Sequence, residues 1–578
     1  MRHVTHRADL CVVGGGLAGM CAAIAAARHG ARVVLMHDRP VLGGNASSEI
    51  RMWVCGAHGA CNRETGIIEE IELDNIRRNP MKNYSLWDVL LYEKVRQEPN
   101  ITLLLNCSCN DATMNGSRLA SIRGWQGTAE TWHSVEAPLF ADCSGDSILA
   151  PLTGAEYRIG REARGEFGEA IEPEEADRKT MGMSLLLQAR ETDRSQPFAP
   201  PAWAHVYARE EDLPFRDHAL PQANFWWIEL GGEADSIHDT EALRDELLKI
   251  ALGVWDHIKN RGDHGAANWA LDWLGFLPGK RESRRYVGDH IITQNDVEAG
   301  GPFEDIIAYG GWTMDDHHPA GFRHPGQPTI WHPAPSPWGI PYRSVYSRTV
   351  ENLFCAGRNI SASHAALSSS RVMKTCALLG QAVGTAAAIA SRDGLTPRGV
   401  YQERLAALQQ TLMEDDCWLP GKARAVAPLT RQAALRASAG DPEPLRNGVD
   451  RLADGVDNGW LGVPGSSWVE YRFAEPTRVR GLRFVFDSDL SRDRADHRMR
   501  SNYALDDAPV PVSPTITRAY RIEVQDADGQ WHTLISELDN HQRLVRYDID
   551  VVARALQFVP EGTWGAPAAH VFAWDVIG

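Results

Sequence analysis

A short apolar run that leads directly into a glycine-rich turn constrains this chain more than any other feature. Residues 10–13 are apolar, and Gly14, Gly16 and Gly19 follow them in the spacing GxGxxG. An alanine-rich segment and a second apolar run come next, so the order is strand, turn, helix, strand. In such a unit the first glycine allows a tight turn, the second lets the backbone approach a pyrophosphate, and the third allows close helix–strand packing. The pattern predicts a dinucleotide site with the phosphates at the helix N-terminus.

A second strand–glycine–helix junction lies far along the chain, within residues 352–392. An apolar run reaches Gly357, and a helix of small residues with Gly380 and Gly384 in its interior is predicted over 370–390. Glycine destabilises a helix interior, so these two positions indicate close backbone packing. Two such junctions suit a cofactor with two ends, because one would hold the ADP half and the other would direct a helix N-terminus at an isoalloxazine ring. A nicotinamide cofactor has no comparable need, so the sequence favours FAD over NAD.

Length and charge limit the remaining classes. A chain of 578 residues is too long for one core, so two or three domains are expected. The net charge of −17 argues against a general nucleic-acid or anionic-membrane surface. No run reaches the roughly 20 apolar residues of a membrane helix, and no signal-peptide region precedes the first strand. We therefore expect a cytoplasmic protein without a nucleic-acid or membrane partner, its ten scattered cysteines reduced.

Changes in the pattern of predicted strands, helices and Pro/Gly breaks divide the chain into regions. The predicted fold class is α/β: a Rossmann-type FAD-binding domain with an inserted β-rich substrate domain, followed by a C-terminal β-sandwich. The FAD-binding domain is discontinuous, over 1–160 and 346–395. The substrate-covering domain, with many tryptophans and Pro/Gly breaks, takes 161–345. A helical linker over 396–446 leads to the sandwich over 447–578.

Five stretches carry a resemblance to a known family: 38–51, 141–146, 281–296, 340–344 and 352–390. Together with the glycine-rich turn, they resemble the FAD-dependent oxidoreductases of the glutathione-reductase-like flavoprotein superfamily. They look most like a bacterial group of these enzymes that is associated with carbohydrate utilisation. The cofactor-binding residues that the turn and the resemblance imply are Gly14, Gly16, Leu17, Ala18, Gly19, His37, Asp38, Arg39, Gly43, Gly44, Asn45, Ser47, Ser48, Arg51, Gly145, Asp146, Gly357 and Arg358.

The adenosine end of the predicted site departs from the superfamily pattern. That pattern ends the second strand with an acidic residue that binds the ribose, whereas here Met36 is followed by His37 and the acid, Asp38, comes one position later. We expect Asp38 to reach the ribose, with His37 as the alternative donor, although Asp38 is nearly as well explained as a turn-former. Cys55 and His58 lie beyond the Gly43–Ser48 loop, and we expect noncovalent neighbours of the cofactor there rather than a covalent link.

Histidine is the expected base for flavin-dependent oxidation of an alcohol, because its pKa lies near working pH and the hydroxyl proton must be accepted. His364 follows the predicted flavin-facing strand, and His317 and His318 lie in a Gly/Pro-bounded loop of the substrate domain. His58 is the fourth candidate. For each of them a purely structural hydrogen-bonding role is the alternative, and at least one of the four is expected to act.

Arginines with forked donors are candidates for holding a polyhydroxylated or anionic substrate. Arg281, Arg284, Arg285 and Arg343 are the group considered, and salt bridges between the substrate domain and the nucleotide-binding domain explain them equally well. The predicted substrate-binding residues are Arg343, Arg284 and Trp312. A further cluster gathers aspartates and histidines along the chain, but its spacing matches no metal motif, and we expect no metal site. Its members are Asp315, Asp316, His317, His318, His324 and His332.

The last 130 or so residues carry a resemblance of their own. The stretches 447–460, 467–473, 479–486 and 569–576 resemble a discoidin-type, galactose-binding-like sandwich. Such modules often bind sugars. The alternative, which we prefer, is that the tryptophans of this region are core residues and the module only supports the catalytic part.

The sequence leads to one predicted function and two alternatives. We expect an FAD-dependent oxidoreductase that removes a hydride from a secondary hydroxyl of a sugar or glycoside, with a histidine as general base. One alternative is redox-neutral glycoside cleavage through transient oxidation, and the other is a non-catalytic sugar-binding protein on a flavoprotein fold. The expected partners are a carbohydrate-like small molecule and an electron acceptor that the sequence does not identify. Oligomeric state is left open.

Overall fold

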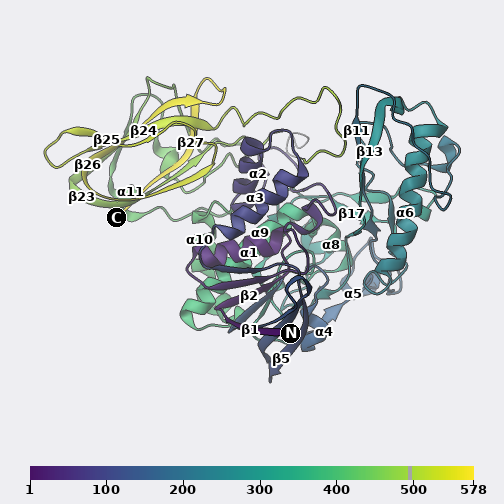
Figure 1. Ribbon diagram of the computed structural model, residues 1–578. Helices are drawn as coiled ribbons and strands as arrows, with labels where there is room; N and C mark the ends of the chain where they lie inside the picture. The colour runs from purple at the N-terminus through teal and green to yellow at the C-terminus, as the bar shows by residue number, and fades with distance from the viewer. Residues whose placement is uncertain (493–497) are drawn as a thin grey trace. The chain divides into compact units, whose positions relative to one another are not determined.

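The computed structural model describes residues 1–492 and 498–578, and its internal contacts divide them into two compact units (Figure 1). Unit 1 comprises residues 1–57, 81–408 and 498–508. Unit 2 comprises the described parts of 58–80, 409–497 and 509–578. The division into four domains with the boundaries given above stays a prediction.

A five-stranded parallel sheet lies at the centre of unit 1, in the order β20-β8-β2-β3-β4. Each strand is short, and all are buried except the edge strand β4, where Thr102 is exposed, as expected when helices cover both faces of a sheet. Val13 is in register with Met36 on one side and with Asp142 on the other, so the carboxyl ends of these strands meet at one edge. The strands are β2 (Leu10–Val13), β3 (Val33–Met36), β4 (Ile101–Leu104), β8 (Leu139–Asp142) and β20 (Leu353–Cys355).

Two helices pack against each other so closely that glycine is required between them. They are α1 (Leu17–Arg28) and α9 (Met373–Asp393). A Cβ on Gly380 would lie 2.0 Å from the carbonyl oxygen of Ala18, and one on Gly384 would lie 2.1 Å from that of Ala22. The close backbone packing expected at the two interior glycines is confirmed.

The α9 helix also corrects one expectation about membrane segments. By length and composition it is able to cross a membrane, with a mean hydropathy of 1.2 over its apolar window. However, 94% of that window is buried inside the protein. Small apolar side chains that pack against α1 explain its composition.

A second layer in unit 1 is a four-stranded sheet in the order β1-β7-β6-β5. Its strands are β1 (Arg2–Arg7), β5 (Cys107–Asn115), β6 (Arg118–Gln126) and β7 (Thr131–Glu136). The helices of the N-terminal and C-terminal parts of the unit are α3 (Tyr84–Arg96), α4 (Leu149–Thr153), α8 (His364–Ser370) and α10 (Pro397–Glu414), the last of which ends in unit 2.

The middle of the chain forms short strand pairs and one long helix, α6 (Thr240–Asp256). This helix packs on a core that contains Trp227, Trp255 and Trp269. The remaining elements are β9 (Tyr157–Arg158), α5 (Arg164–Phe167), β10 (Met183–Ser184), β11 (Leu187–Glu191), β12 (Glu229–Leu230), β13 (Trp269–Leu274), β14 (Gly279–Lys280), β15 (Arg285–Tyr286), α7 (Gln294–Glu298), β16 (Ile306–Gly310), β17 (Met314–His317), β18 (Thr329–His332) and β19 (Trp338–Pro341).

Unit 2 is built on a seven-stranded antiparallel sheet in the order β22-β27-β23-β26-β24-β25, with β21 paired to β23. Register shifts interrupt β23 and β26, as bulges do where long strands bend between layers. The predicted fold class, an α/β flavoprotein domain followed by a C-terminal β-sandwich, is confirmed. The elements are α11 (Pro428–Gln432), β21 (Ala434–Ala437), β22 (Trp460–Gly462), β23 (Val469–Phe486), β24 (Thr517–Gln525), β25 (Trp531–Glu537), β26 (Leu544–Thr563) and β27 (Ala569–Ile577).

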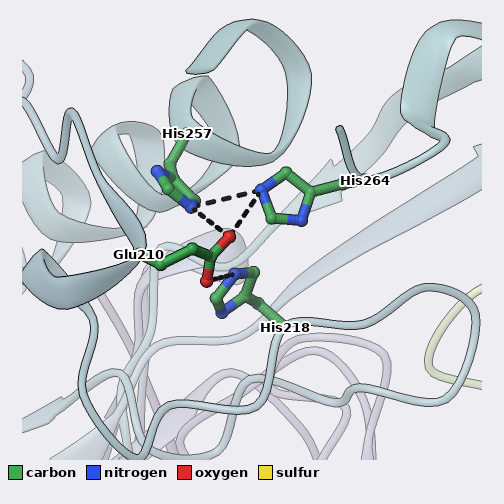
Figure 2. Close-up of side chains that lie close together, drawn as sticks. All are labelled: Glu210, His218, His257 and His264. Atoms are coloured by element: carbon green, nitrogen blue, oxygen red, sulfur yellow. Dashed lines mark hydrogen bonds and ion pairs between the residues drawn. The ribbon is translucent and has the colours of Figure 1, made fainter. Parts of the chain in front are cut away.

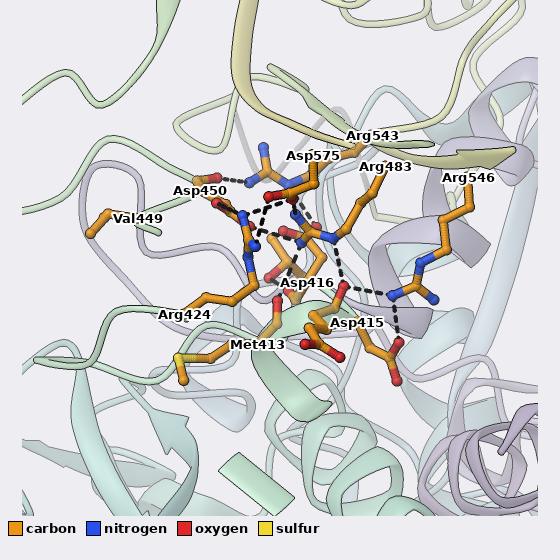
Figure 3. Close-up of polar contacts among 12 residues, drawn as sticks. Met413, Asp415, Asp416, Arg424, Val449, Asp450, Arg483, Arg543, Arg546 and Asp575 are labelled. Atoms are coloured by element: carbon orange, nitrogen blue, oxygen red, sulfur yellow. Dashed lines mark hydrogen bonds and ion pairs between the residues drawn. The ribbon is translucent and has the colours of Figure 1, made fainter. Parts of the chain in front are cut away.

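A buried network of arginines and aspartates lies within unit 2 (Figure 3). Arg424 pairs with Asp450 at 3.1 Å and with Asp575 at 2.9 Å, and Arg483 pairs with the same two carboxylates. Arg483 also donates to the carbonyl oxygen of Glu414 at 2.8 Å, the last residue of α10. The network therefore ties the end of α10 to β23 and β27 by charge-assisted hydrogen bonds.

One helix from the N-terminal part of the chain belongs to unit 2. It is α2 (Ile67–Arg78), and its Glu69 is buried against Arg492 at 2.7 Å. Asp74 of the same helix accepts from His541 at 2.7 Å. The sandwich of this protein thus includes a helix that lies more than 300 residues upstream, which the sequence did not indicate.

Candidate functional site

A cavity of about 670 Å³ opens at the carboxyl ends of the central parallel strands of unit 1, where ligands bind in open α/β sheets. The glycine-rich turn, the loop after β3, the loop after β8 and the Gly357 turn all line it. The predicted cofactor-binding residues among its lining residues are Gly14, Gly16, Leu17, Ala18, His37, Asp38, Arg39, Gly43, Gly44, Asn45, Gly145, Asp146, Gly357 and Arg358.

The N-terminus of α1 fits the phosphates of a dinucleotide. Gly16 is its N-cap and, among the described residues, no side chain caps the first turn, so backbone N–H groups there are available to an anion. A Cβ on Gly16 would meet only the Cα of Gly44, at 3.9 Å, so the space in front of the helix is open. A Cβ on Gly14 would instead lie 2.4 Å from the carbonyl oxygen of Cys143. The two glycines therefore have different roles. Gly14 is required by the turn, whereas Gly16 leaves space for a ligand to approach the helix.

His37 supports the glycine-rich turn from behind. Its Nδ1 accepts from the backbone N–H of Gly15 at 3.0 Å, and its Nε2 donates to the carbonyl oxygen of Val41 at 3.0 Å. The ring is buried, whereas the neighbouring Asp38 is more than half exposed and lines the cavity. One oxygen of the Asp38 carboxylate lies 3.2 Å from Nδ1 of His37, and the assignment of Asp38 to the ribose stays a prediction.

Asp146 lies at the centre of a group of charged side chains that line the cavity. It pairs with Arg358 at 2.8 Å and with Lys280 at 2.8 Å, and the hydroxyl of Ser283 donates to it at 2.8 Å. Burial opposes its ionisation, but the two cations and the hydrogen bonds lower the pKa of Asp146 to about 2. Two residues that the sequence assigned separately to the cofactor, Asp146 and Arg358, are thus bonded to each other.

The opposite part of the cavity carries a buried histidine between two carboxylates. Nδ1 of His317 lies 2.7 Å from Glu229 and its Nε2 lies 3.3 Å from Asp315. Each carboxylate also has an arginine: Arg281 lies 3.3 Å from Glu229, and Arg371 lies 3.2 Å from Asp315. Each of the two carboxylates that face the imidazole is thus also paired with an arginine.

Asp315 stays ionised in this network. Burial works against its charge, but His317, Arg371 and the hydroxyl of Thr329 hold the pKa of the carboxyl well below its usual range. Asp315, Arg371 and His317 all line the cavity. The arrangement places one imidazole, with a carboxylate beside its Nε2, at the wall of the dinucleotide-type cavity.

His364, the first sequence candidate for the base, lies elsewhere. Its ring nitrogens contact Glu282 at 2.8 Å and Asp316 at 3.1 Å, and it does not line the cavity. Burial alone would lower its pKa, but the two carboxylates raise the pKa of His364 well above its usual value. At neutral pH the imidazole is therefore protonated and has no lone pair with which to accept a proton.

Several other predicted residues also lie off the cavity wall. Arg343 pairs with the buried Asp305 at 2.9 Å, Arg284 donates to the carbonyl oxygen of Asp146, and His318 stacks on His324 at 3.7 Å between centroids. Arg285 is held by Glu162 and Glu282, which lie like Arg285 itself within the predicted substrate domain, so these are not the salt bridges between domains that the alternative predicted. His58 falls in unit 2. The cofactor residues not among the lining residues are Gly19, Ser47, Ser48 and Arg51.

Trp312 lines the cavity, as expected of a substrate-binding residue, together with residues that the sequence did not single out. They come mainly from the middle of the chain, and no spacing rule joins them. Arg281 was considered there only as one of four arginines. The additional lining residues with polar or aromatic side chains include Trp53, Asn224, Trp226, Lys280, Trp331, Arg371 and Arg498. Cys55 and Asp315, which the sequence did single out, also line the cavity.

Comparison with solved structures gives likenesses of low identity to parts of the chain. A family 32 carbohydrate-binding module of EndoD from Streptococcus pneumoniae is 14% identical, over 26% of this chain and 97% of that chain, with a TM-score of 0.20. A chitosan-binding module from Paenibacillus sp. IK-5 is 13% identical, over 26% of this chain and 98% of that one, with a TM-score of 0.18. The myxobacterial chondrochloren halogenase CndH is 16% identical, over 33% and 46% of the two chains, with a TM-score of 0.23.

The family comparison covers all the lining residues of the cavity except Arg498. No curated protein matches the chain. The model of the family described as FAD dependent oxidoreductase matches residues 9–412, more than two thirds of the chain. The match includes both strand–glycine–helix junctions and the histidine at the cavity wall. The chain therefore belongs to the FAD-dependent oxidoreductase family, and its cofactor is FAD.

Proposed function

We propose that this oxidoreductase removes a hydride from a secondary hydroxyl of a sugar or glycoside, with His317 as the general base. The observation that carries the proposal is the buried pair of His317 and Asp315 on the wall of the same cavity that the dinucleotide-binding loops line. Bound FAD supplies the hydride acceptor. The residues described below orient the substrate and handle its hydroxyl proton.

His317 is arranged to take a proton at Nε2. Its Nδ1–H donates to Glu229 at 2.7 Å, which fixes the ring, so in the neutral form of the ring the lone pair is on Nε2. The carboxylate of Asp315 lies 3.3 Å from Nε2, longer than the usual 2.7–3.2 Å of a strong N–H···O bond. In the proposed step the substrate hydroxyl donates to Nε2 of the neutral ring. Once Nε2 is protonated, Asp315 stabilises the imidazolium.

The substrate class is inferred from the lining and from the family resemblance. Aromatic rings of Trp226, Trp312 and Trp331 share the cavity with the amide of Asn224 and the guanidinium of Arg281. Aromatic side chains with a few polar groups between them suit a ligand that has both apolar C–H faces and hydroxyl groups at its edges. A sugar ring is such a ligand. The secondary hydroxyl to be oxidised would approach Nε2 of His317.

The test is the visible spectrum of the FAD-loaded protein without oxygen, before and after addition of a panel of sugars and glycosides. We expect the flavin bands to bleach with at least one of them. With that substrate, His317→Gln should bleach about 10²–10⁴ times more slowly, because a general base contributes that much. His238→Gln is the matched control, since the side chain of His238 is exposed and its ring pairs with Asp235 of its own loop.

Three results would count against the proposal in different ways. Normal bleaching by His317→Gln with full FAD content would remove His317 from the base role. FAD bands that no sugar bleaches would remove the sugar assignment. Product formed from a glycoside without any electron acceptor would favour redox-neutral cleavage instead.

A further inference from the structure

Four side chains from separate segments of unit 1 converge away from the FAD cavity (Figure 2). They are Glu210, His218, His257 and His264, and none of them lines the cavity. Each offers one ligand atom, and all four atoms lie within 4.8 Å of one another. Glu210 begins a short 3₁₀ turn, His218 lies in the loop after it, and His257 and His264 follow the end of α6.

The distances match the edges of a tetrahedral metal site. Nε2 of His257 and Nε2 of His264 are 3.2 Å apart, and both lie close to the same oxygen of Glu210, at 3.4 and 3.3 Å. Zinc–nitrogen and zinc–oxygen bonds of about 2.0–2.1 Å place neighbouring ligands of a tetrahedron roughly 3.3–3.4 Å apart. Nε2 of His218 lies 3.4 Å from the second oxygen of Glu210 and completes the group.

Hydrogen bonds behind two of the rings leave the correct nitrogen free for a metal. Nδ1 of His218 lies 2.6 Å from the carbonyl oxygen of Arg216, and Nδ1 of His257 lies 2.9 Å from that of Tyr207. A carbonyl oxygen only accepts, so in both rings Nδ1 carries the proton and Nε2, when the ring is neutral, carries the lone pair. A hydrogen bond from the other ring nitrogen to a backbone carbonyl is the usual support of a metal-bound histidine.

Two of the three histidines are buried, and the carboxylate is open to solvent. The side chains of His257 and His218 are 1% and 10% exposed. Glu210 supplies one negative charge, more than half exposed to solvent, so a path for an ion is open.

We propose that Glu210, His218, His257 and His264 bind one Zn²⁺ ion in a tetrahedral site of three imidazole nitrogens and one carboxylate oxygen. Imidazole and carboxylate are ligands that suit zinc, and four protein ligands leave no open position, as in structural sites. The ion would fasten the loop over 207–218 to the end of α6. The π-helical turn His257–Arg261, where α6 ends, presents His257 to the group, and such turns are frequent at functional sites.

This proposal departs from the expectation of no metal site. The sequence directed attention to a different cluster, from Asp315 to His332, whereas the four residues here are spread over a segment of 55 residues without a motif spacing. His218 and His257 are 39 positions apart. Only the fold brings them together.

The test uses the full-length, tag-free protein, stripped with a chelator and equilibrated with low-micromolar Zn²⁺, with zinc measured by mass spectrometry. We expect about one zinc per chain and a rise in thermal midpoint on zinc addition. His264→Gln and Glu210→Gln, the two most exposed members, should lose at least tenfold in zinc affinity and lose the thermal response. His238→Gln should keep both.

A second readout protects the test against variants that do not fold. Co²⁺ added to the metal-free wild type should give the strong visible difference bands of a tetrahedral site, and Zn²⁺ should displace them. Binding of less than a tenth of an equivalent by the wild type, or wild-type affinity in both variants, would overturn the proposal. FAD content and flavin bleaching report separately on the proposed function, because none of these four residues lines that cavity.

Discussion

His317 and His364 are two buried histidines with similar partners and different positions. Each ring lies between two carboxylates. Arginines also hold these carboxylates: Arg281 and Arg371 those around His317, and Arg285 the carboxylate of Glu282. His317 lines the cavity and His364 does not, and the carboxylates around His364 raise its pKa well above the usual value, so His317 is the better candidate for the base. His364 is better suited to hold Glu282 and Asp316 in place.

Gly14 and Gly16 allow a sharp test of what each glycine of the turn does. Gly14 has φ +104° and no room for a Cβ, so Gly14→Ala should destabilise the fold. Gly16 has φ −68° and open space before it, so Gly16→Ala should leave the thermal midpoint of the FAD-free protein within about 2 °C of wild type. Its methyl group would occupy the space before the helix N-terminus, so FAD affinity should fall at least tenfold, as measured by titration of FAD fluorescence. A Gly16→Ala variant with normal affinity would move the phosphates away from this turn.

The ion pairs of Asp146 predict a loss of stability in acid. Its folded-state pKa is about 2 against an ordinary 3.8, so the unfolded chain binds more protons between these values. The contribution, about 2 kcal/mol, is therefore complete above pH of about 5 and is lost as the pH falls through 2. Asparagine does not titrate, so the difference in urea midpoint between wild type and Asp146→Asn should shrink from pH 5 to pH 2. Asp193→Asn, at an exposed position of the same unit, should show no such change. A constant difference for Asp146→Asn would contradict the assignment.

At the scale of elements, the packing of α1 on α9 links fold stability to the cofactor site. Gly380→Ala gains about 1 kcal/mol of helix propensity. Its Cβ, however, would lie 2.0 Å from the carbonyl oxygen of Ala18, in the first turn of α1, and overpacking costs about 1–3 kcal/mol or more. We expect a lower thermal midpoint and reduced FAD content in the purified protein. Gly165→Ala in α5 is the control, because no atom lies within 4 Å of its Cβ, and it should be neutral or stabilising. A Gly380→Ala protein as stable as wild type would show that the helices separate at little cost.

The elements also show which parts of the site were accessible from sequence. The two strand–glycine–helix junctions were predictable because their signals are local: a glycine, an apolar run and a helix start within a few residues. The helix predicted over 370–390 is α9, which begins three residues later, at Met373. A separate helix, α8, ends at Ser370, and the guanidinium of Arg371 between the two helices reaches Asp315. No local pattern marks that contact. The same holds for Glu229 and Arg281, which meet at His317 only through the fold.

At the scale of the whole molecule, unit 2 contains more of the chain than residues 447–578. Its α2 helix comes from residues 58–80, and Glu69, Asp74 and Arg77 of that helix each pair with the C-terminal part of the chain. Glu69 is buried, and Arg492 and Arg63 hold its pKa far below the usual range against the effect of burial. Removal of a partner from a buried ion pair costs about 3–5 kcal/mol, because a charge remains unpaired.

A fragment of residues 447–578 alone is therefore expected to be unstable. It lacks both α2 and Arg424, which pairs with Asp450 and Asp575 in the buried network. We expect a thermal midpoint at least 10 °C below that of a fragment of residues 409–578, and we expect a synthetic peptide of residues 58–80 to raise the midpoint of the longer fragment. A peptide with Glu69→Gln should raise it less, because Arg492 then lacks its anionic partner. If 447–578 unfolds cooperatively at the same temperature as the longer fragment with its peptide, the sandwich is an independent module and α2 only rests against it. If the 447–578 fragment is an independent module, sugar binding by the C-terminal region is best measured on that fragment. If the fragment is unstable, sugar binding has to be measured on the full chain.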